Sequence, residues 1–516
     1  MATISDVRAA LALDLRIAAG GRVLPGGWAE GLRFGAAALL LPQVPALLWW
    51  MEAGSSVYLR GWINLEYLAL LGVALLWPCW GTVALLVGEM CVALAEPLAR
   101  IYYFSPGDML RSVRFVLQIP GQRLMGYACL VLVYAVGSGV VLRACLGDLR
   151  RRGVKLKLAV IAALAMVALT SDLAMGRFKP RFHVGPERSD PGKRAAKISG
   201  TPVASTLFNM FFPPGHGRVV ARQALGAALG AAIAEVPAGT QPNVVLVLTE
   251  SWGLATDDRV NEAQMAPFRT EAMARSYRVE SGSVPFVGPT TSGETRELCG
   301  DSRGDSSIAA AASYFASCWP ERLRREGYRT IAVHGFTPTM FRRQEWYGRF
   351  GFEEAAFLPE LARGGAAMCD GAFPGICDAD VAQWIGGRLM HPADGRPVFV
   401  HWVTLNSHLP VPRMDESLPR EGCAAAGIDE GQSLCTWFGL VMRVQESVAR
   451  LAETPGLRPT IFVVVGDHAP PFVREDVRDR FSQTRVPYVV LMPRAMMGAA
   501  GRAEVAAVRT MESRPP

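Results

Sequence analysis

The sequence predicts two parts: an N-terminal five-helix transmembrane domain and, after it, an α/β sandwich domain with a mostly parallel sheet. Two observations lead to this prediction. Long apolar runs crowd into residues 1–180, and from residue 243 short apolar runs alternate with helical stretches. Five near-span runs in so short a stretch are too many to bury in a soluble core. Alternating apolar strands and helices are typical of a parallel sheet covered on both faces.

Each apolar run approaches the ~20 residues that a helix needs to cross a bilayer. The runs cover residues 33–51, 63–80, 82–99, 125–145 and 156–175. The first contains Pro42 and Pro45 and the third contains Glu89 and Glu96, so these two are the weaker matches. The alternative is a set of buried helices in a soluble domain, which the number of runs disfavours. We therefore assign residues 30–178 to a membrane-embedded, multi-pass domain.

The loops orient these spans. RACLGDLRRRGVKLK, between the fourth and fifth runs, is rich in arginine and lysine, which marks it as cytoplasmic. Everything after residue 178 then lies on the outer side of the membrane, although Arg111, Arg114 and Arg123 on that side run against this orientation. The first residues lack the compact apolar core of a cleavable signal peptide. The net charge of +7 is too modest to indicate a nucleic-acid binder.

The outer part divides into three segments. Residues 179–242 form a basic connector containing one expected helix, residues 243–497 form the α/β domain, and residues 498–516 form a flexible tail. Six of the ten cysteines lie in this part: Cys299, Cys318, Cys369, Cys377, Cys423 and Cys435. An even number in an exported domain predicts disulfides, although six cysteines allow 15 connectivities, and pairing of sequence neighbours would close three short loops. A zinc cluster is the alternative, but the sequence lacks a CxxC pair.

Four strand-like runs end in side chains that can bind a metal ion or a phosphate. NVVLVLTE ends at Glu250, RTIAVHG carries His334, PVFVHWVTLNSH ends at His408, and PTIFVVVGDH ends at Asp467 and His468. In open α/β sheets, ligands bind beyond the carboxyl ends of the strands. A single histidine at a strand end is usually structural, but four converging runs predict a functional site at this edge.

Three of these residues suit one divalent cation. Glu250, Asp467 and His468 offer carboxylate and imidazole ligands, which both zinc and manganese accept, and three protein ligands leave a coordination position open. The polar stretch PTTSGETRELCG (residues 289–300) would by itself be a surface loop. A threonine hydroxyl from it in the open position would be activated as a nucleophile.

The reacting group would be a phosphoryl or sulfuryl centre, whose developing negative charge needs cations and hydrogen-bond donors. His334, Arg343 and His408 can supply them, and the planar guanidinium of Arg343 suits a tetrahedral oxyanion. The neighbouring Arg342 cannot be separated from Arg343 on sequence alone.

An ordered series of six motifs resembles the sulfatase-like branch of the alkaline phosphatase superfamily. The motifs are NVVLVLTESWG, PTTSGETRE, LRREGYRTIAVHG, FRRQEWYGRFGF, TLNSHLP and VVVGDHAPP. The series resembles most the membrane-anchored lipoteichoic acid synthases and phosphoethanolamine transferases. The resemblance covers residues 30–178 in architecture and 243–495 in motifs. It implies an enzyme of the bacterial inner membrane with an outer, periplasmic-side catalytic domain. Such an enzyme takes a head group from a phospholipid donor, holds it on a threonine, and passes it to an envelope glycan or glycolipid.

The resemblance also implies roles for single residues. The implied metal ligands are Glu250, Thr290, Asp467 and His468. The nucleophile of the family stands four residues before a glutamate, which counted back from Glu294 gives Thr290, with Thr291 as the alternative. The implied head-group contacts are His334, Arg343, His408 and Phe341. Phe341 stands where the glycerol-phosphate branch has tryptophan, so the choice between phosphoglycerol and phosphoethanolamine stays open.

Features of both branches are present. CDGAFPGICD and the spacing of Cys423 and Cys435 resemble the phosphoethanolamine branch, but the histidine which that branch carries after its Asp-His motif does not follow His468, so one cation is expected. A sulfatase in the strict sense is a rival because CWPER, from Cys318, matches its nucleophile motif. That string lies well after residues 289–300, lacks the downstream Leu-Thr-Gly, and its cysteine is expected to pair with Cys299.

Two other readings remain. A sulfatase-like hydrolase, acting as a phosphodiesterase or a sulfuric ester hydrolase, would use the same metal site with water as the acceptor. A non-catalytic envelope protein would be expected to have lost the ligands, and here they are all present.

Overall fold

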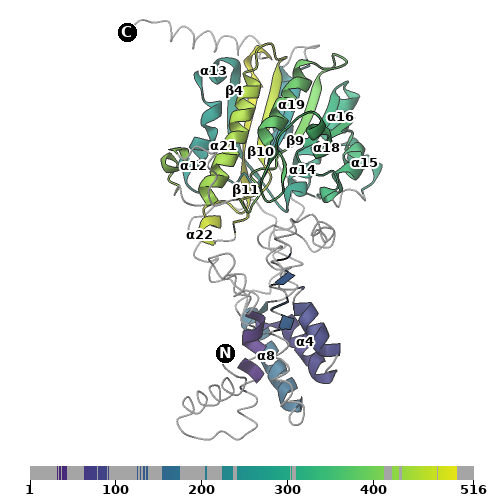
Figure 1. Cartoon of the computed structure of the whole chain (residues 1–516), viewed down its shortest axis with the longest axis vertical. Coiled ribbons are helices and arrows are strands. Elements are labelled where there is room, and N and C mark those ends of the chain that lie inside the picture. The colour runs from purple at the N-terminus through teal and green to yellow at the C-terminus, as the bar shows by residue number, and fades with distance from the viewer. Residues whose placement is uncertain are drawn as a thin grey trace. The chain divides into compact units, whose positions relative to one another are not determined.

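The structure is a computed structural model of the chain (Figure 1). Of the C-terminal part it describes residues 223–235, 241–302, 304, 310–411, 421–428, 433–472 and 475–496. Of the N-terminal part it describes 32, 34–36, 38–43, 63–77, 80–89, 91, 154–174, 204–205 and isolated positions between 125 and 136. Contacts divide the chain into two compact units, Met1–Arg100 with Leu117–Gly215, and Ile101–Val116 with His216–Pro516. Each unit is considered by itself.

The N-terminal unit contains the helices α4 (Leu65–Leu76) and α8 (Val154–Ala174), a short turn η1 (Leu41–Gln43), and a parallel pair of two-residue strands, β1 (Ile63–Asn64) and β2 (Ala204–Ser205). Among the residues described, α8 is the one helix long and apolar enough to cross a membrane. Helix α4 is shorter, and the runs at 33–51, 82–99 and 125–145 lie partly outside the described residues. The five-helix arrangement therefore stays a prediction.

The C-terminal unit is built on a seven-stranded sheet in the order β4-β11-β10-β3-β9-β5-β6. Its strands are β3 (Asn243–Thr249), β4 (Tyr277–Pro285), β5 (Arg329–His334), β6 (Glu354–Ala356), β9 (Val398–Val403), β10 (Thr460–Gly466) and β11 (Arg485–Pro493). From β10 to β6 all neighbours run parallel, and β11 and β4 add an antiparallel edge. The mostly parallel α/β domain expected from the sequence is confirmed.

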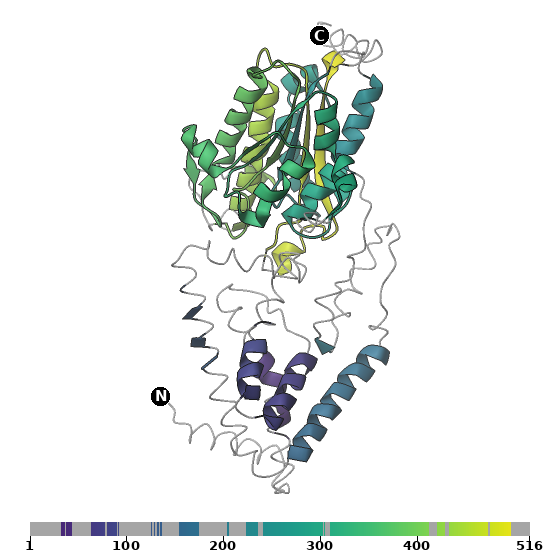
Figure 2. The ribbon, with the colours of Figure 1, turned by 90° about the vertical axis from the view of Figure 1, so that its right-hand side faces the viewer.

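Helices cover both faces of this sheet (Figure 2). The described helices of the unit are α11 (Ala224–Glu235), α12 (Asp258–Met265), α13 (Glu271–Ser276), α14 (Thr290–Cys299), α15 (Ala312–Ala316), α16 (Trp319–Arg325), α17 (Arg343–Trp346), α18 (Leu358–Arg363), α19 (Asp378–Met390), α20 (Glu421–Ala425), α21 (Ser433–Ala452) and α22 (Glu475–Arg478). Short 3-10 turns η4 (Ala266–Phe268), η6 (Met340–Arg342), η7 (Gly348–Phe350) and η8 (Arg494–Met496) and a hairpin of β7 (Met368–Cys369) and β8 (Gly375–Ile376) complete the unit.

The central strands are buried over their whole length, which explains their continuous apolar sequences. Residues 244–248 of β3 and 461–465 of β10 are all inaccessible to solvent. The register of the two strands pairs Thr249 with Gly466, their last residues. Glu250 and Asp467 therefore leave the sheet side by side. On the other side of β3, Leu248 pairs with Val403 of β9, and Val403 pairs with His334 of β5.

Three disulfides join sequence-adjacent cysteines of the C-terminal unit. They are Cys299–Cys318, Cys369–Cys377 and Cys423–Cys435, so the expectation of disulfides is confirmed. Cys318 stands at the N-cap of α16, and its bond to Cys299 ties the start of that helix to the end of α14. Its sulfur is not free for the chemistry that CWPER would perform in a sulfatase.

We expect that replacing both Cys299 and Cys318 by serine lowers the free energy of unfolding of the C-terminal unit by about 3 kcal/mol. The bond closes a loop over a sequence separation of 19, and the reduced unfolded chain regains that freedom. Urea unfolding of the full chain in detergent, followed by tryptophan fluorescence, measures the change. Cys91→Ser is the control, because Cys91 is a free, exposed cysteine. An unchanged midpoint in the double variant would contradict the prediction.

Candidate active site

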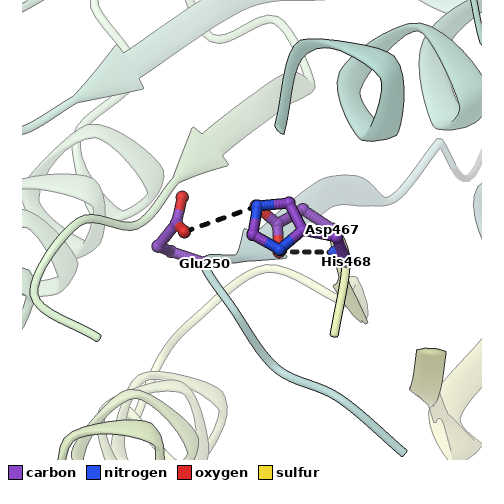
Figure 3. Close-up of side chains that lie close together, drawn as sticks. All are labelled: Glu250, Asp467 and His468. Carbon is purple, nitrogen blue, oxygen red and sulfur yellow. Dashed lines mark hydrogen bonds and ion pairs between the residues drawn. The ribbon is translucent and has the colours of Figure 1, made fainter. Parts of the chain in front are cut away.

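Glu250, Asp467 and His468 converge at the carboxyl edge of the sheet (Figure 3). One ligand atom from each lies within 4.8 Å of the others, and all three side chains are buried. His468 Nε2 is 3.3 Å from Asp467 Oδ2 and 3.7 Å from Glu250 Oε1. The register of β3 and β10 brings the two carboxylates together, although they are separated by more than two hundred residues in the sequence.

The three side chains are arranged as ligands of a cation would be. Asp467 Oδ1 accepts the backbone N–H of Ser251 at 2.7 Å and of His468 at 2.6 Å. Asp467 Oδ2 is buried and has no hydrogen-bond partner among the described residues. His468 Nδ1 lies 2.9 Å from the carbonyl of Ala469, which suits a protonated Nδ1 and leaves the Nε2 lone pair for a metal. Two carboxylates and an imidazole therefore fit zinc or manganese.

The electrostatics agree with that interpretation. Burial and the nearby Glu250 carboxylate raise the pKa of Asp467 above its ordinary value. Burial opposes protonation of His468, but the Asp467 and Glu250 carboxylates outweigh it and raise the pKa of the imidazole. Two buried carboxylates repel each other, and a divalent cation between them would relieve that repulsion.

Thr290 is the first residue of α14 and is buried beside Glu250. Its Oγ1 donates to Glu250 Oε2 at 3.1 Å. The neighbouring Thr291 faces another way, since a Cβ added at Gly304 would lie 2.8 Å from Thr291 Oγ1. Of the two threonines, Thr290 thus places its hydroxyl against the candidate ligands. It is the first residue of α14, and the positive end of a helix dipole also suits an anion there.

Helix α14 is held tightly against the turn that carries Asp467. A side chain at Gly293 would approach Asp467 Cα and Cβ to 3.1 Å, so glycine permits this close packing. Arg296, fully buried, donates to the carbonyls of Gly466 at 2.6 Å and Asp467 at 3.1 Å. Glu297 pairs with Arg296 at 2.7 Å. The helix therefore carries Thr290 and supports the Asp467 turn at once.

Arg343, the first residue of α17, lies in a buried cluster around Glu294 of α14. Its Nε donates to Glu294 Oε1 at 3.0 Å, and its Nη2 forms an ion pair with the same oxygen at 2.9 Å. Tyr347 OH donates to Glu294 Oε2 at 2.6 Å. His401 Nε2, from the middle of β9, lies 3.3 Å from the same oxygen. Burial would raise the pKa of Glu294, but the Arg343 charge and the His401 and Tyr347 hydrogen bonds hold it at about 2. The structure also separates the two arginines, because Arg342 is partly exposed and pairs with Glu345.

His334 and His408 are both held neutral. His334 Nδ1 lies 3.0 Å from the Val403 carbonyl, and burial and the Arg343 charge lower its pKa to about 3. His408 Nδ1 lies 2.6 Å from the Leu409 carbonyl, and burial and the His468 charge lower its pKa to about 4. Near neutral pH both imidazoles therefore act as hydrogen-bonding groups without charge, and Arg343 is the cation of this side of the site.

Phe341 lies next to Arg343 in an unusual backbone conformation. Both Phe341 and Arg342 have positive φ angles, 51° and 57°, in the left-handed region that L-residues rarely adopt. The guanidinium carbon of Arg343 lies 5.3 Å from the centre of the Phe341 ring. Such strain clusters at functional sites and is sustained by surrounding contacts, here by Trp346 Nε1, which donates to the Phe341 carbonyl at 3.0 Å.

The loop after β9 supports Glu250 and His408, and the sequence did not point to the residues that hold it. Thr404 Oγ1 accepts the Glu250 N–H at 2.9 Å, and Ser407 Oγ donates to the Glu250 carbonyl at 2.6 Å. Asp378, at the start of α19, accepts the Leu405 N–H at 3.0 Å and the Asn406 N–H at 2.8 Å. Ser251 also went unnoticed; its hydroxyl donates to Glu250 Oε1 at 2.7 Å.

The sequence did not point to His401 and Tyr347 either. They lie inside an apolar strand and an aromatic-rich turn, and nothing local marks them as polar partners of Glu294. The histidine in the buried run VFVHWV is the one available signal, because a fully buried histidine requires a hydrogen-bond partner.

The C-terminal domain is similar to proteins of known family and known structure. Residues 242–497 match the Sulfatase family model. No curated protein matches the sequence. Among solved structures, the lipoteichoic acid synthase LtaP of Listeria monocytogenes is similar, with 13% identity, a TM-score of 0.37 and coverage of 49% of this chain. The chain spans 66% of LtaP, just under two thirds of its length.

Two further structures are similar at the same level. Streptococcus pyogenes phosphoglycerol transferase GacH, solved with sn-glycerol-1-phosphate, is 16% identical over 52% of this chain and 72% of its own, with a TM-score of 0.35. The C-terminal periplasmic domain of Escherichia coli EcEptC, solved with Zn, is 15% identical over 50% of this chain and 75% of its own, with a TM-score of 0.30. The family-model match thus identifies residues 242–497 of this chain as a Sulfatase domain.

Proposed function

We propose that this protein transfers a phospholipid head group, phosphoethanolamine or phosphoglycerol, to an envelope glycan or glycolipid through a covalent intermediate on Thr290. The observation that supports this most is the hydrogen bond from Thr290 Oγ1 to Glu250 Oε2, beside Asp467 and His468. It presents a hydroxyl to a ligand set for one divalent cation, zinc or manganese. The ordered motifs of the sequence point to the same branch of the family.

In the first step the Thr290 oxygen attacks the phosphorus of the lipid phosphodiester, and the bond from phosphorus to the diacylglycerol oxygen breaks. The bound cation would lower the pKa of the Thr290 hydroxyl and neutralise charge on the phosphoryl group. Glu250 accepts the hydrogen bond of that hydroxyl and so aims the oxygen. In the second step an acceptor hydroxyl attacks the same phosphorus and releases Thr290.

The rest of the site would receive the head group. Arg343 supplies a fixed positive charge, while His334 and His408 supply neutral imidazoles that can hydrogen bond to a hydroxyl or an ammonium group. Phe341 packs beside Arg343 and would form an apolar wall. The proposed mechanism thus assigns Arg343, His334, His408 and Phe341 to binding of the head group.

The membrane part of the proposal rests on α8 and on the apolar runs of the sequence. A lipid donor requires a catalytic domain near a bilayer, and α8 is long and apolar enough to cross one. We place the protein in the bacterial inner membrane as a multi-pass enzyme, with residues 243–497 on the periplasmic side. The alternative is a hydrolase with the same metal site, in which water takes the place of the acceptor.

We expect Thr290→Ala to abolish the covalent intermediate and to lower transfer by about 10³-fold or more, because the nucleophile is lost. The full chain is incubated with phosphatidylethanolamine or phosphatidylglycerol and examined by intact-protein mass spectrometry. Fragmentation of the tryptic peptide of residues 279–296 then locates the adduct. The mass of the adduct identifies the donor.

Thr291→Ala is the matched control, since it removes the adjacent hydroxyl and is expected to keep both adduct and transfer. Thr290→Ser should retain a measurable adduct. Loss of the adduct in Thr291→Ala with full activity in Thr290→Ala would move the nucleophile by one residue. A protein that forms no adduct but releases phosphate or sulfate from a soluble ester would be a hydrolase.

We also expect chelation to remove activity and zinc or manganese to restore it, because the cation activates the threonine and screens the two carboxylates. Metal content is measured by mass spectrometry of dialysed protein. Asp467→Asn should lose the metal, and added metal should no longer raise its melting temperature. Asp394→Asn, which breaks an ion pair with Arg396 on the surface, is the control. Full activity in metal-free protein would refute the proposed mechanism.

A further inference from the structure

Glu294 lies four residues after Thr290, one turn along α14, and faces a group of buried polar side chains. Its side chain is inaccessible to solvent and meets Arg343, Tyr347 and His401, each at most 1% exposed. The contacts come from two other parts of the chain: Arg343 and Tyr347 from α17 and the residue that caps it, and His401 from β9. Complete burial of a carboxylate is costly unless an opposite charge and hydrogen bonds compensate for it, as these three side chains do here.

The two carboxylate oxygens of Glu294 contact different side chains. Oε1 accepts from Arg343 Nε and forms an ion pair with Nη2, while Oε2 accepts from Tyr347 OH and lies 3.3 Å from His401 Nε2. Tyr347 keeps its proton, because burial and the Glu294 charge raise its pKa well above the ordinary value. With its second oxygen anchored by Tyr347, the carboxylate holds Nε and Nη2 of Arg343 in place.

One nitrogen of Arg343 is left open. Arg343 Nη1 is buried and has no hydrogen-bond partner among the described side chains and backbone. The Glu250 carboxylate contributes to raising the pKa of Arg343, and the Arg343 charge contributes to lowering the pKa of His334. The guanidinium therefore lies within the electrostatic field of both. A buried, charged donor without an acceptor is ready to receive one from a bound molecule.

We propose that Glu294 is a positioning residue that holds Arg343 with Nη1 free for the phosphoryl group carried by Thr290. This inference rests on the proposed transfer reaction. Thr290 and Glu294 occupy the same face of one short helix, so the attacking oxygen and the support of the guanidinium belong to one rigid element. Tyr347 and His401 act through Glu294, since they fix the second oxygen of its carboxylate.

Glu294→Gln tests this role with little change of shape. The amide oxygen can still accept from Arg343, and the amide N–H₂ can donate to Tyr347 OH or to His401 Nε2 after a change of imidazole tautomer. We expect the maximal rate of adduct formation on Thr290 to fall about 10- to 100-fold, with a smaller change in KM, because misplacement of the guanidinium acts on the transition state. Metal content should stay close to that of the unchanged protein. The melting temperature should fall, because the buried Arg343 guanidinium loses its counter-charge, so the rates are compared well below that temperature.

A double-mutant cycle separates this role from a structural one. If Glu294 acts through Arg343, the pair Glu294→Gln with Arg343→Gln should react no more slowly than Arg343→Gln alone. Glu354→Gln is the matched control, because this carboxylate also pairs with two arginines, Arg329 and Arg388, but lies on the edge strand β6. That variant should keep the rate of adduct formation.

The positioning role would be overturned if the fold-losses in the rate of adduct formation of the two single variants multiply in the double variant. An unchanged rate in Glu294→Gln would overturn it too. Loss of metal in Glu294→Gln, or unfolding of this variant at the assay temperature, would do so as well, since the effect would then be structural. If the unchanged protein forms no adduct, the proposed transfer fails. The same four proteins are then compared in hydrolysis of a soluble p-nitrophenyl phosphodiester, where absence of coupling between Glu294 and Arg343 overturns the inference independently.

Discussion

The pairing of β3 with β10 is the constraint on which the candidate site depends. Because Thr249 and Gly466 stand opposite each other at the ends of these strands, Glu250 and Asp467 must emerge side by side. A slip of one residue would turn the two carboxylates to opposite faces. The strands are fully buried and apolar, which fixes the register. Burial and the adjacent Glu250 carboxylate raise the pKa of Asp467, and a cation shared by the two carboxylates would relieve their repulsion.

The neighbouring backbone is arranged to keep these side chains in place. Arg296 binds the carbonyls beside Asp467, and the loop after β9 binds the backbone of Glu250 through Thr404 and Ser407. Asp378 in turn orders that loop from the start of α19. The ligand atoms are thus oriented by hydrogen bonds from several elements, so that little rearrangement is needed when a cation or a phosphoryl group arrives.

The sequence predicted what depends on local pattern and missed what depends on tertiary partners. Apolar runs identified the strands, and polar residues at their ends identified Glu250, His334 and Asp467, because strand ends in a parallel sheet share an edge. His401 and Asp378 lie inside ordinary-looking strand and helix sequences, and only their partners far along the chain give them a role. Arg342 and Arg343 are adjacent and chemically identical. The left-handed backbone at Phe341 and Arg342 distinguishes them, and no local sequence pattern predicts it.

The charges of the site also favour one class of donor. Glu294 neutralises Arg343, and a divalent cation would neutralise Glu250 and Asp467, while His334 and His408 carry no charge near neutral pH. The assembled site therefore has little net charge. Arg343 orients a bound phosphoryl group more than it attracts one from a distance. A phosphodiester, with one negative charge, needs less compensation in such a site than a phosphate monoester with two. Phospholipids are phosphodiesters, so the charge balance agrees with a lipid donor.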